Sequence, residues 1–220
     1  MDHYTFQHCF LTLFMSLAWS AFIACEECHN ITLSPSESNL TLSQFAANSS
    51  IYVEPNTKLI LLPGKHSLNS SISLANLVYV QILTYDINET MIVCTESANL
   101  AFHNITQVNI KGVKFIGCEG SRLESVSQVI LEDLMFMGPQ ENATALELVE
   151  IVDASILRSS FILNTAGTFR RNVELLEFFK REYVSYYVNI DTDASIGGAL
   201  IITNSSINII ECLFLSLIHI

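Results

Sequence analysis

A cysteine pair close to the N-terminus is the first candidate in this chain for a chemical role. Cys25, Cys28 and His29 have the C-x-x-C-H spacing of a haem-attachment motif. The motif directly follows an apolar N-terminal segment and lies outside the repeats described below. We therefore expect structural disulfide chemistry at these cysteines, with a redox pair and haem attachment as the alternatives.

The only candidate carboxylate pair is formed by Asp191 and Asp193. Paired carboxylates do the acid–base work of many glycosidases. The Gly-His-Gly and Arg-x-Lys motifs that accompany such a pair in β-helix glycosidases do not occur in the sequence. We therefore expect a solvated loop at residues 191–193 and predict no catalytic residue.

Metal-ligating residue types are scattered along the chain. Asp133 and Asp153 are too far apart in sequence to predict the clustered acids of a calcium site. His66 and His103 are isolated, and no third ligand for zinc accompanies them. The sequence therefore predicts neither a metal site nor a cofactor.

The remaining cysteines indicate an oxidising compartment. Cys94 and Cys118 are 24 residues apart, which is about one repeat of the chain, and we predict a disulfide between them. Once Cys9 is removed with a signal peptide, an odd number of cysteines is left. Cys212 falls in an inward position of the repeat and is predicted to be a buried thiol.

Asparagines in Asn-x-Ser/Thr triplets are candidate glycosylation sites. There are eight of them: Asn30, Asn39, Asn48, Asn69, Asn88, Asn104, Asn142 and Asn204. This number favours a secreted or cell-surface glycoprotein. The alternative is that Asn- and Ser-rich turns create such triplets by chance.

The N-terminal segment 1–24 has the features of a secretory signal peptide. Residues 10–24 are apolar, a length too short to span a bilayer comfortably, and Ala18 and Ser20 have cleavage-site spacing. Residues 1–7 contain no Lys or Arg, which keeps an uncleaved anchor as the alternative. We expect no other membrane span.

A short sequence pattern occurs four times: apolar-x-apolar-x-x-[small or apolar]-x-Phe. We call it the repeated phrase. Its copies begin at Val108, Val129, Ala154 and Ile207, so the intervals are 21, 25 and 53 residues. A repeat of this length is typical of a solenoid, in which stacked units share one core.

The runs between residues 51 and 214 predict an all-β fold, a right-handed parallel β-helix solenoid. They are short, alternate apolar with polar residues and are separated by Asn, Ser and Gly. A β-sandwich is disfavoured because the sequence has no Asn-Gly or Asp-Gly hairpin pair. Aligning the repeats predicts two inward rows: Val113, Leu134, Ser159 and Cys212, and Phe115, Phe136, Phe161 and Phe214.

Residues 25–50 predict an exposed leader followed by an N-terminal cap. Thr41 and Gln44 have capping-box spacing, and a short helix from this point would carry Leu42, Phe45 and Ala46 on one side. Such a helix would cover the open end of the solenoid, where exposed strand edges invite pairing with other chains.

The 53-residue interval indicates an insertion at about residues 168–196. Val173, Leu176, Phe179 and Tyr183 are spaced like one face of a helix, and four of the ten basic residues lie between 170 and 181. We expect a helical excursion that packs on the solenoid, with a partner-binding helix as the alternative.

The last six residues, 215–220, match the translation of a common sequencing-library adapter. We therefore expect an artefactual tail and a natural protein that continues; the alternative is a genuine edge strand.

Two motifs carry a resemblance to a known family. Residues 161–164 read FxxN and residues 197–200 read GGAL, and Cys212 and Phe214 follow with Cys-x-Phe spacing. This order resembles the FxxN and GGA[ILV] repeats of polymorphic outer-membrane-type proteins and their invertebrate surface relatives, which have pectin-lyase-like β-helices. The resemblance covers about residues 59–214, and it implies an adhesive or structural surface role, less often carbohydrate processing.

The net charge and the repeats together indicate which classes of function we expect for this chain. The net charge of −12 disfavours binding to nucleic acid or to an anionic membrane. We expect a non-catalytic structural or adhesive module at the cell surface or outside the cell, with a glycan or a protein as ligand. The alternative is a polysaccharide lyase or glycoside hydrolase whose active groove lies partly in C-terminal coils missing from this sequence.

Overall fold

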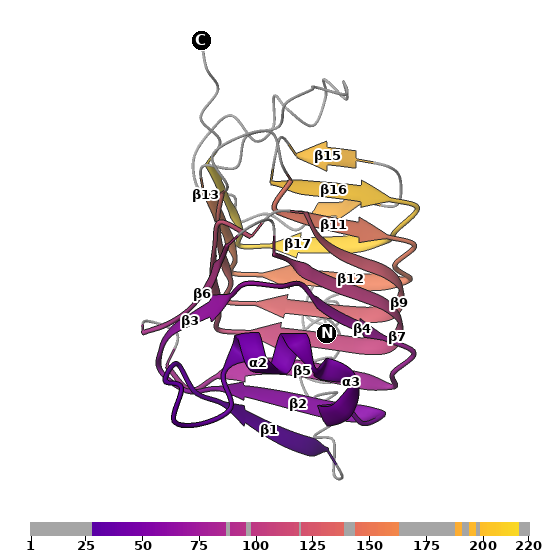
Figure 1. The fold of residues 1–220 in the computed structure, drawn as a ribbon. Helices are drawn as coiled ribbons and strands as arrows, with labels where there is room; N and C mark the ends of the chain where they lie inside the picture. The colour runs from indigo at the N-terminus through magenta and orange to yellow at the C-terminus, as the bar shows by residue number, and fades with distance from the viewer. Residues whose placement is uncertain are drawn as a thin grey trace, which may run out of the picture.

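The fold of the chain is a stack of parallel β-coils (Figure 1). The computed structural model describes residues 28–86, 89–95, 98–118, 120–138, 144–162, 188–190, 194–196 and 199–215. In these residues the chain forms short strands and two short helices, α2 at Leu42–Ala47 and α3 at Ser49–Tyr52. The predicted parallel β-helix is therefore confirmed as a parallel β-solenoid.

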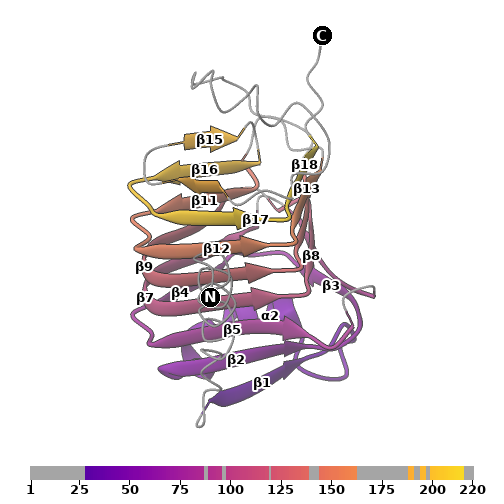
Figure 2. The ribbon, with the colours of Figure 1, turned by 180° about the vertical axis from the view of Figure 1, so that it is seen from behind.

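Each coil contributes strands to three columns that run along the solenoid axis. The first column contains β4 (Ile72–Ala75), the starts of β7 (Leu100–Lys111) and β9 (Ser121–Glu132), β11 (Leu146–Val149) and β16 (Leu200–Thr203). The second contains β1 (His29–Leu33), β2 (Asn56–Leu61), β5 (Tyr79–Thr84), the ends of β7 and β9, β12 (Asp153–Leu157) and β17 (Ile207–Ile210). Figure 2 shows the second column from the outside.

The third column forms a sheet of its own. Its six strands are β3 (Gly64–Leu68), β6 (Thr90–Cys94), β8 (Lys114–Ile116), β10 (Met135–Met137), β13 (Ser160–Ile162) and β18 (Leu213–Leu215). The first two columns belong to one larger sheet, because β7 and β9 run through both of them.

The four copies of the repeated phrase stack in register. Val108 pairs with Val129, Val129 with Ala154, and Ala154 with Ile207, all in parallel. The coil between Ala154 and Ile207 returns to the same register despite its 53-residue interval. All four residues are fully buried, so the phrase marks the inward face of the second column, as alternation predicts.

The predicted phenylalanine row is a continuous stack of rings inside the third column. The ring centroids of Phe115 and Phe136 are 4.9 Å apart, those of Phe136 and Phe161 5.0 Å, and those of Phe161 and Phe214 4.8 Å. The rings lie within 11° of parallel. Neighbouring parallel strands are about 4.8 Å apart, so an in-register repeat places like side chains face to face.

Left-handed backbone at the turns also stacks from coil to coil. Between the first and second columns, positive φ angles occur at Asn76, Asn104, Ser125, Glu150 and Asn204. Between the second and third columns they occur at Gly112, Asp133, Arg158 and Glu211. A non-glycine residue adopts this conformation at a cost of about 1–2 kcal/mol. Each row therefore uses one residue per coil to turn the chain at the same place.

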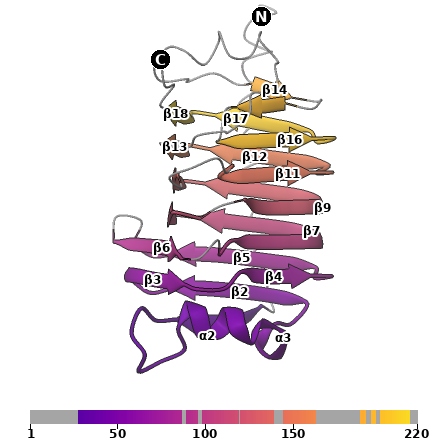
Figure 3. The ribbon, with the colours of Figure 1, turned by 45° about the horizontal axis from the view of Figure 1, so that its top comes forward.

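The N-terminal end of the solenoid is covered by α2 and α3 (Figure 3). Thr41 and Gln44 form the predicted capping box, and Leu42 and Phe45 are buried where α2 packs against β3 and β4. The predicted leader differs from expectation at β1, which pairs with β2 and buries Ile31 and Leu33. This part of the leader belongs to the solenoid.

Two short strands end the larger sheet at the other end. β14 (Val188–Ile190) pairs antiparallel with β17, and β15 (Ala194–Ile196) pairs antiparallel with β16. The described parts of the predicted helical insertion are thus strands. The helix expected at 168–183 lies outside the described residues. The predicted signal segment 1–24 also lies outside them. Leu215 ends β18, and the rest of the predicted tail, 216–220, also lies outside them.

Removing a ring from the middle of the phenylalanine row should destabilise the fold strongly. Phe136 is 3% exposed and lies between two stacked rings. We expect Phe136→Ala to lower the free energy of unfolding by about 3–5 kcal/mol, because a cavity replaces the ring. Tyr85→Ala, at a side chain that is 76% exposed, is the control and should change it by about 0.5 kcal/mol or less. Equal losses for the two variants, measured by denaturant unfolding, would contradict the buried stack.

Candidate functional site

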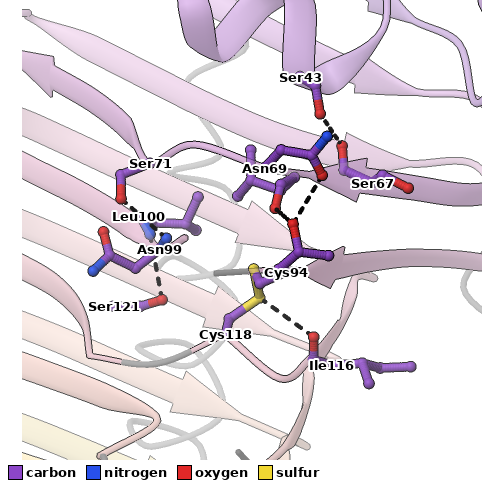
Figure 4. Close-up of a disulfide and its surroundings, with 12 residues drawn as sticks. Ser43, Ser67, Asn69, Ser71, Cys94, Asn99, Leu100, Ile116, Cys118 and Ser121 are labelled. Carbon is purple, nitrogen blue, oxygen red and sulfur yellow. Dashed lines mark hydrogen bonds between the residues drawn. A yellow bond between two sulfur atoms is a disulfide. The ribbon is translucent and has the colours of Figure 1, made fainter. Parts of the chain in front are cut away.

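The predicted disulfide joins two successive coils of the third column (Figure 4). Cys94 ends β6, Cys118 follows β8, and the two sulfurs are bonded with a Cα–Cα distance of 4.9 Å. Pairing of Val93 with Ile116 brings the two cysteines to the same corner. Next to Cys94, the Thr95 hydroxyl donates a hydrogen bond to Asn69 Oδ1 at 2.9 Å. The disulfide and its surroundings thus fix the turn that leads out of the third column.

The C-x-x-C-H motif has structural contacts where it is described. Cys28 is disulfide-bonded, and His29 begins β1, with its Nδ1 3.5 Å from Glu54 Oε1. A sulfur in a disulfide is not available for the thioether bond of an attached haem. Cys25 lies outside the described residues.

Cys212 is a buried thiol, as predicted. Its Sγ is 3.3 Å from the carbonyl oxygen of Ile210 and 3.4 Å from that of Ile156, and it donates to these groups. Burial raises the pKa of the thiol to about 11, so Cys212 stays protonated at neutral pH. Ser159 lies one coil earlier in the row and donates in the same way to the carbonyl of Leu157, at 2.9 Å.

The candidate glycosylation sites that the structure describes are all exposed. They are Asn30, Asn39, Asn48, Asn69, Asn104 and Asn204; Asn88 and Asn142 lie outside the described residues. Asn104 and Asn204 occupy the same left-handed turn row, three coils apart. The side chain of Asn104 is already engaged, because its amide nitrogen donates to Asn76 Oδ1 at 2.7 Å.

An ion cluster lies outside the turn between the second and third columns. Arg158 bonds Asp133 through Nε at 2.7 Å and also bonds Glu132, while Lys111 Nζ lies 3.0 Å from Glu132 Oε2. Glu132 is 7% exposed, so these cations compensate a nearly buried carboxylate. The hydrogen bond from Arg158 to Asp133 is the largest influence that raises the pKa of the guanidinium.

A second ion cluster lies on the outer face of the first column. Arg122 bonds Glu124 at 3.1 Å and Glu147, one coil later, at 3.2 Å. His103 Nδ1 is 3.8 Å from Glu124 Oε2. The hydrogen bond from Arg122 lowers the pKa of Glu124. Glu124 is therefore ionised at neutral pH and holds no proton that a general acid would donate.

Neither cluster was predicted from the sequence, although the aligned repeats contain the signal for the first of them. Lys111 and Glu132 occupy the same position of successive phrases, and Asp133 and Arg158 occupy the next position of successive phrases. Reading the outward positions of the repeat from coil to coil, rather than only its apolar positions, places these opposite charges side by side.

The isolated acids and histidines stay apart in the fold. Asp133 forms an ion pair at the turn where the strands of the second column end. Asp153 lies where these strands begin, at the first residue of β12. His66 is buried, with Nε2 2.7 Å from the Leu62 carbonyl, and burial lowers its pKa. Asp191 and Asp193 lie outside the described residues. In the parts of the chain that are described, no group of three or more His, Cys, Asp or Glu side chains could hold a metal ion.

Comparison with family models, curated proteins and solved structures finds no match to this chain. Neither described helix has the length and apolar character needed to cross a membrane. The fold and the chemistry of its surfaces therefore carry the functional argument.

The two ion clusters should differ in their effect on stability. We expect Arg158→Ala to lower the free energy of unfolding by about 1.5–3 kcal/mol, because Glu132 is nearly buried and loses a charged hydrogen bond. Arg122→Ala is the matched control; it removes an arginine that also bridges two coils, but among exposed partners, and should have a much smaller effect. A larger loss for Arg122→Ala in denaturant unfolding would contradict this assignment.

Proposed function

We propose that the chain is an extracellular or cell-surface glycoprotein that acts as a non-catalytic structural or adhesive binding module, with a glycan or a protein as ligand. The observation that carries this proposal is the pairing of charges along the outer faces. Arg158 bonds Glu132 and Asp133 of the preceding coil, and Arg122 bonds Glu124 on its own strand and Glu147 one coil later. Such pairs hold neighbouring coils together, and the pKa of Glu124 is lowered rather than raised toward a catalytic value.

The proposed location outside the cell has separate support. The described Asn-x-Ser/Thr asparagines are exposed, where a glycan can be attached without disturbing the core. The disulfide between Cys94 and Cys118 is of the kind that persists in an oxidising compartment. The resemblance of residues 161–164 and 197–200 to the repeats of pectin-lyase-like surface proteins is consistent with the same location.

Expression of the full chain in insect or mammalian cells tests the proposal. We expect the protein in the culture medium, with a mass that falls when N-glycans are removed enzymatically. Asn39→Gln, in an exposed loop, should remove one glycan's mass, whereas Asn56→Gln, outside any such triplet, should remove none. Retention in the cytoplasm without glycans would refute the extracellular assignment.

The same secreted protein distinguishes a binding module from the enzymatic alternative. We expect retention on an immobilised glycan or protein with no chemical change to the ligand. Release of reducing ends or unsaturated products from a polysaccharide panel, lost when Asp191 and Asp193 are both replaced by Asn, would instead establish a hydrolase or lyase.

A further inference from the structure

The N-terminal cap leaves one strand edge of the solenoid open. β1 is the outermost strand of the second column, and it pairs on one side only, with β2 (Figure 1). The cap helices α2 and α3 pack against β3 and β4, which belong to the other two columns. Within the described residues, no strand lies along the other side of β1. Such an edge is a template on which a strand of another chain can pair.

Two residues of β1, Asn30 and Thr32, direct their backbone groups away from β2. In a parallel pair, alternate residues of a strand bond the same neighbouring strand. The Leu33 carbonyl accepts from the Leu62 amide at 3.0 Å, so Leu33 and Ile31 face β2. The amides and carbonyls of Asn30 and Thr32 therefore lie on the open side. They have no hydrogen-bond partner within the described residues.

The chain on either side of β1 limits the open edge to these two residues. Ser34 is the next residue on the open side, and its amide donates to the Leu40 carbonyl at 2.9 Å in the loop before α2. Cys28, two residues before Asn30, is held by a disulfide. The open edge thus consists of two amide donors and two carbonyl acceptors, from Asn30 and Thr32.

A second copy of the chain matches this edge group for group. Around a two-fold axis at Ile31, two antiparallel β1 strands place Asn30 of each copy opposite Thr32 of the other. Each of these pairs exchanges two backbone hydrogen bonds, so every open amide and carbonyl of both copies is used. β1 contains no Lys, Arg, Asp or Glu, the residues that usually prevent edge pairing.

The residues of the open edge also form a glycosylation triplet. Asn30, Ile31 and Thr32 read Asn-x-Thr, with Asn30 as the acceptor and Thr32 as the residue that completes the signal. The side chains of Asn30 and Thr32 are exposed, whereas Ile31 is 6% exposed and faces the core. An N-glycan is bulky and keeps to the solvent. Attached at Asn30, it would occupy the space through which a second strand has to approach.

We propose that an N-glycan on Asn30 shields the open edge of β1 and prevents a second copy of the chain from pairing with it. The glycan takes the place of the charged side chains or prolines that protect the edges of other sheets. This inference rests on the proposed glycoprotein and specifies what one of its glycans does.

Substitutions at Thr32 separate the effect of the glycan from that of the backbone edge. Thr32→Val and Thr32→Pro both destroy the triplet, so each protein lacks a glycan at Asn30. The valine variant keeps the backbone N–H at position 32, whereas the proline variant removes this donor, which β2 does not use. Asn30→Gln removes the glycan and keeps all the open backbone groups. Asn39→Gln, which removes a triplet in an exposed loop, is the control.

The measurement is the average mass of each secreted full chain, by analytical ultracentrifugation at concentrations up to about 1 mM. A contact of a few backbone hydrogen bonds gives a weak dimer, with a Kd of about 1 mM. Glycopeptide mapping reports whether Asn30 is occupied, and unfolding midpoints report whether each variant is folded. Should Thr32→Pro fail to fold, Thr32→Lys replaces it, because a lysine on the edge also prevents pairing.

We expect the mass of Asn30→Gln and of Thr32→Val to rise with concentration toward that of a dimer. The unaltered chain, Asn39→Gln and Thr32→Pro should remain monomeric. A monomeric Asn30→Gln, a dimeric Thr32→Pro, or an unoccupied Asn30 in a chain glycosylated elsewhere would overturn this inference and leave the proposed function standing. Retention in the cytoplasm without any N-glycan would overturn both.

Discussion

Parallel, in-register hydrogen bonding between successive coils determines how the other features of the solenoid are arranged. It places each residue directly on the residue at the same position of the next coil, about 4.8 Å away. The consequence inside is a set of rows of like side chains, such as the stacked rings from Phe115 to Phe214. A single substitution in such a row acts on two neighbouring coils at once.

The same constraint governs the outside of the solenoid. Outward side chains on consecutive coils are neighbours, so like charges would repel and opposite charges attract. Lys111, Glu132 and Arg158 use this adjacency to neutralise a nearly buried carboxylate. At the turns, Asp133 and Arg158 combine left-handed backbone with ion pairing, so one position both bends the chain and ties two coils together.

Features that follow from the register were predictable from the sequence. The inward rows, the disulfide between Cys94 and Cys118 and the capping box at Thr41 all follow from spacing along the chain. Strands that pair outside the repeat were not predictable. β1 has only five residues, two of them buried, and its partner β2 follows a loop and two helices. β14 and β15 have three residues each and run antiparallel to the solenoid, so no repeat marks them. The outward ion pairs were missed because apolar periodicity describes only the inward side.

The register across the 53-residue interval can be measured with an engineered disulfide. Ser155 and Asn208 are Cα partners on the outer face of β12 and β17, and paired strands bring Cα atoms to about 5 Å, within disulfide reach. Cysteines introduced as Ser155→Cys and Asn208→Cys should cross-link on mild oxidation, and non-reduced peptide mapping should show the linked pair. Ser155→Cys with Ile210→Cys, two residues out of register on the same face, should cross-link far less. Efficient cross-linking of the second pair instead of the first would contradict the in-register stack.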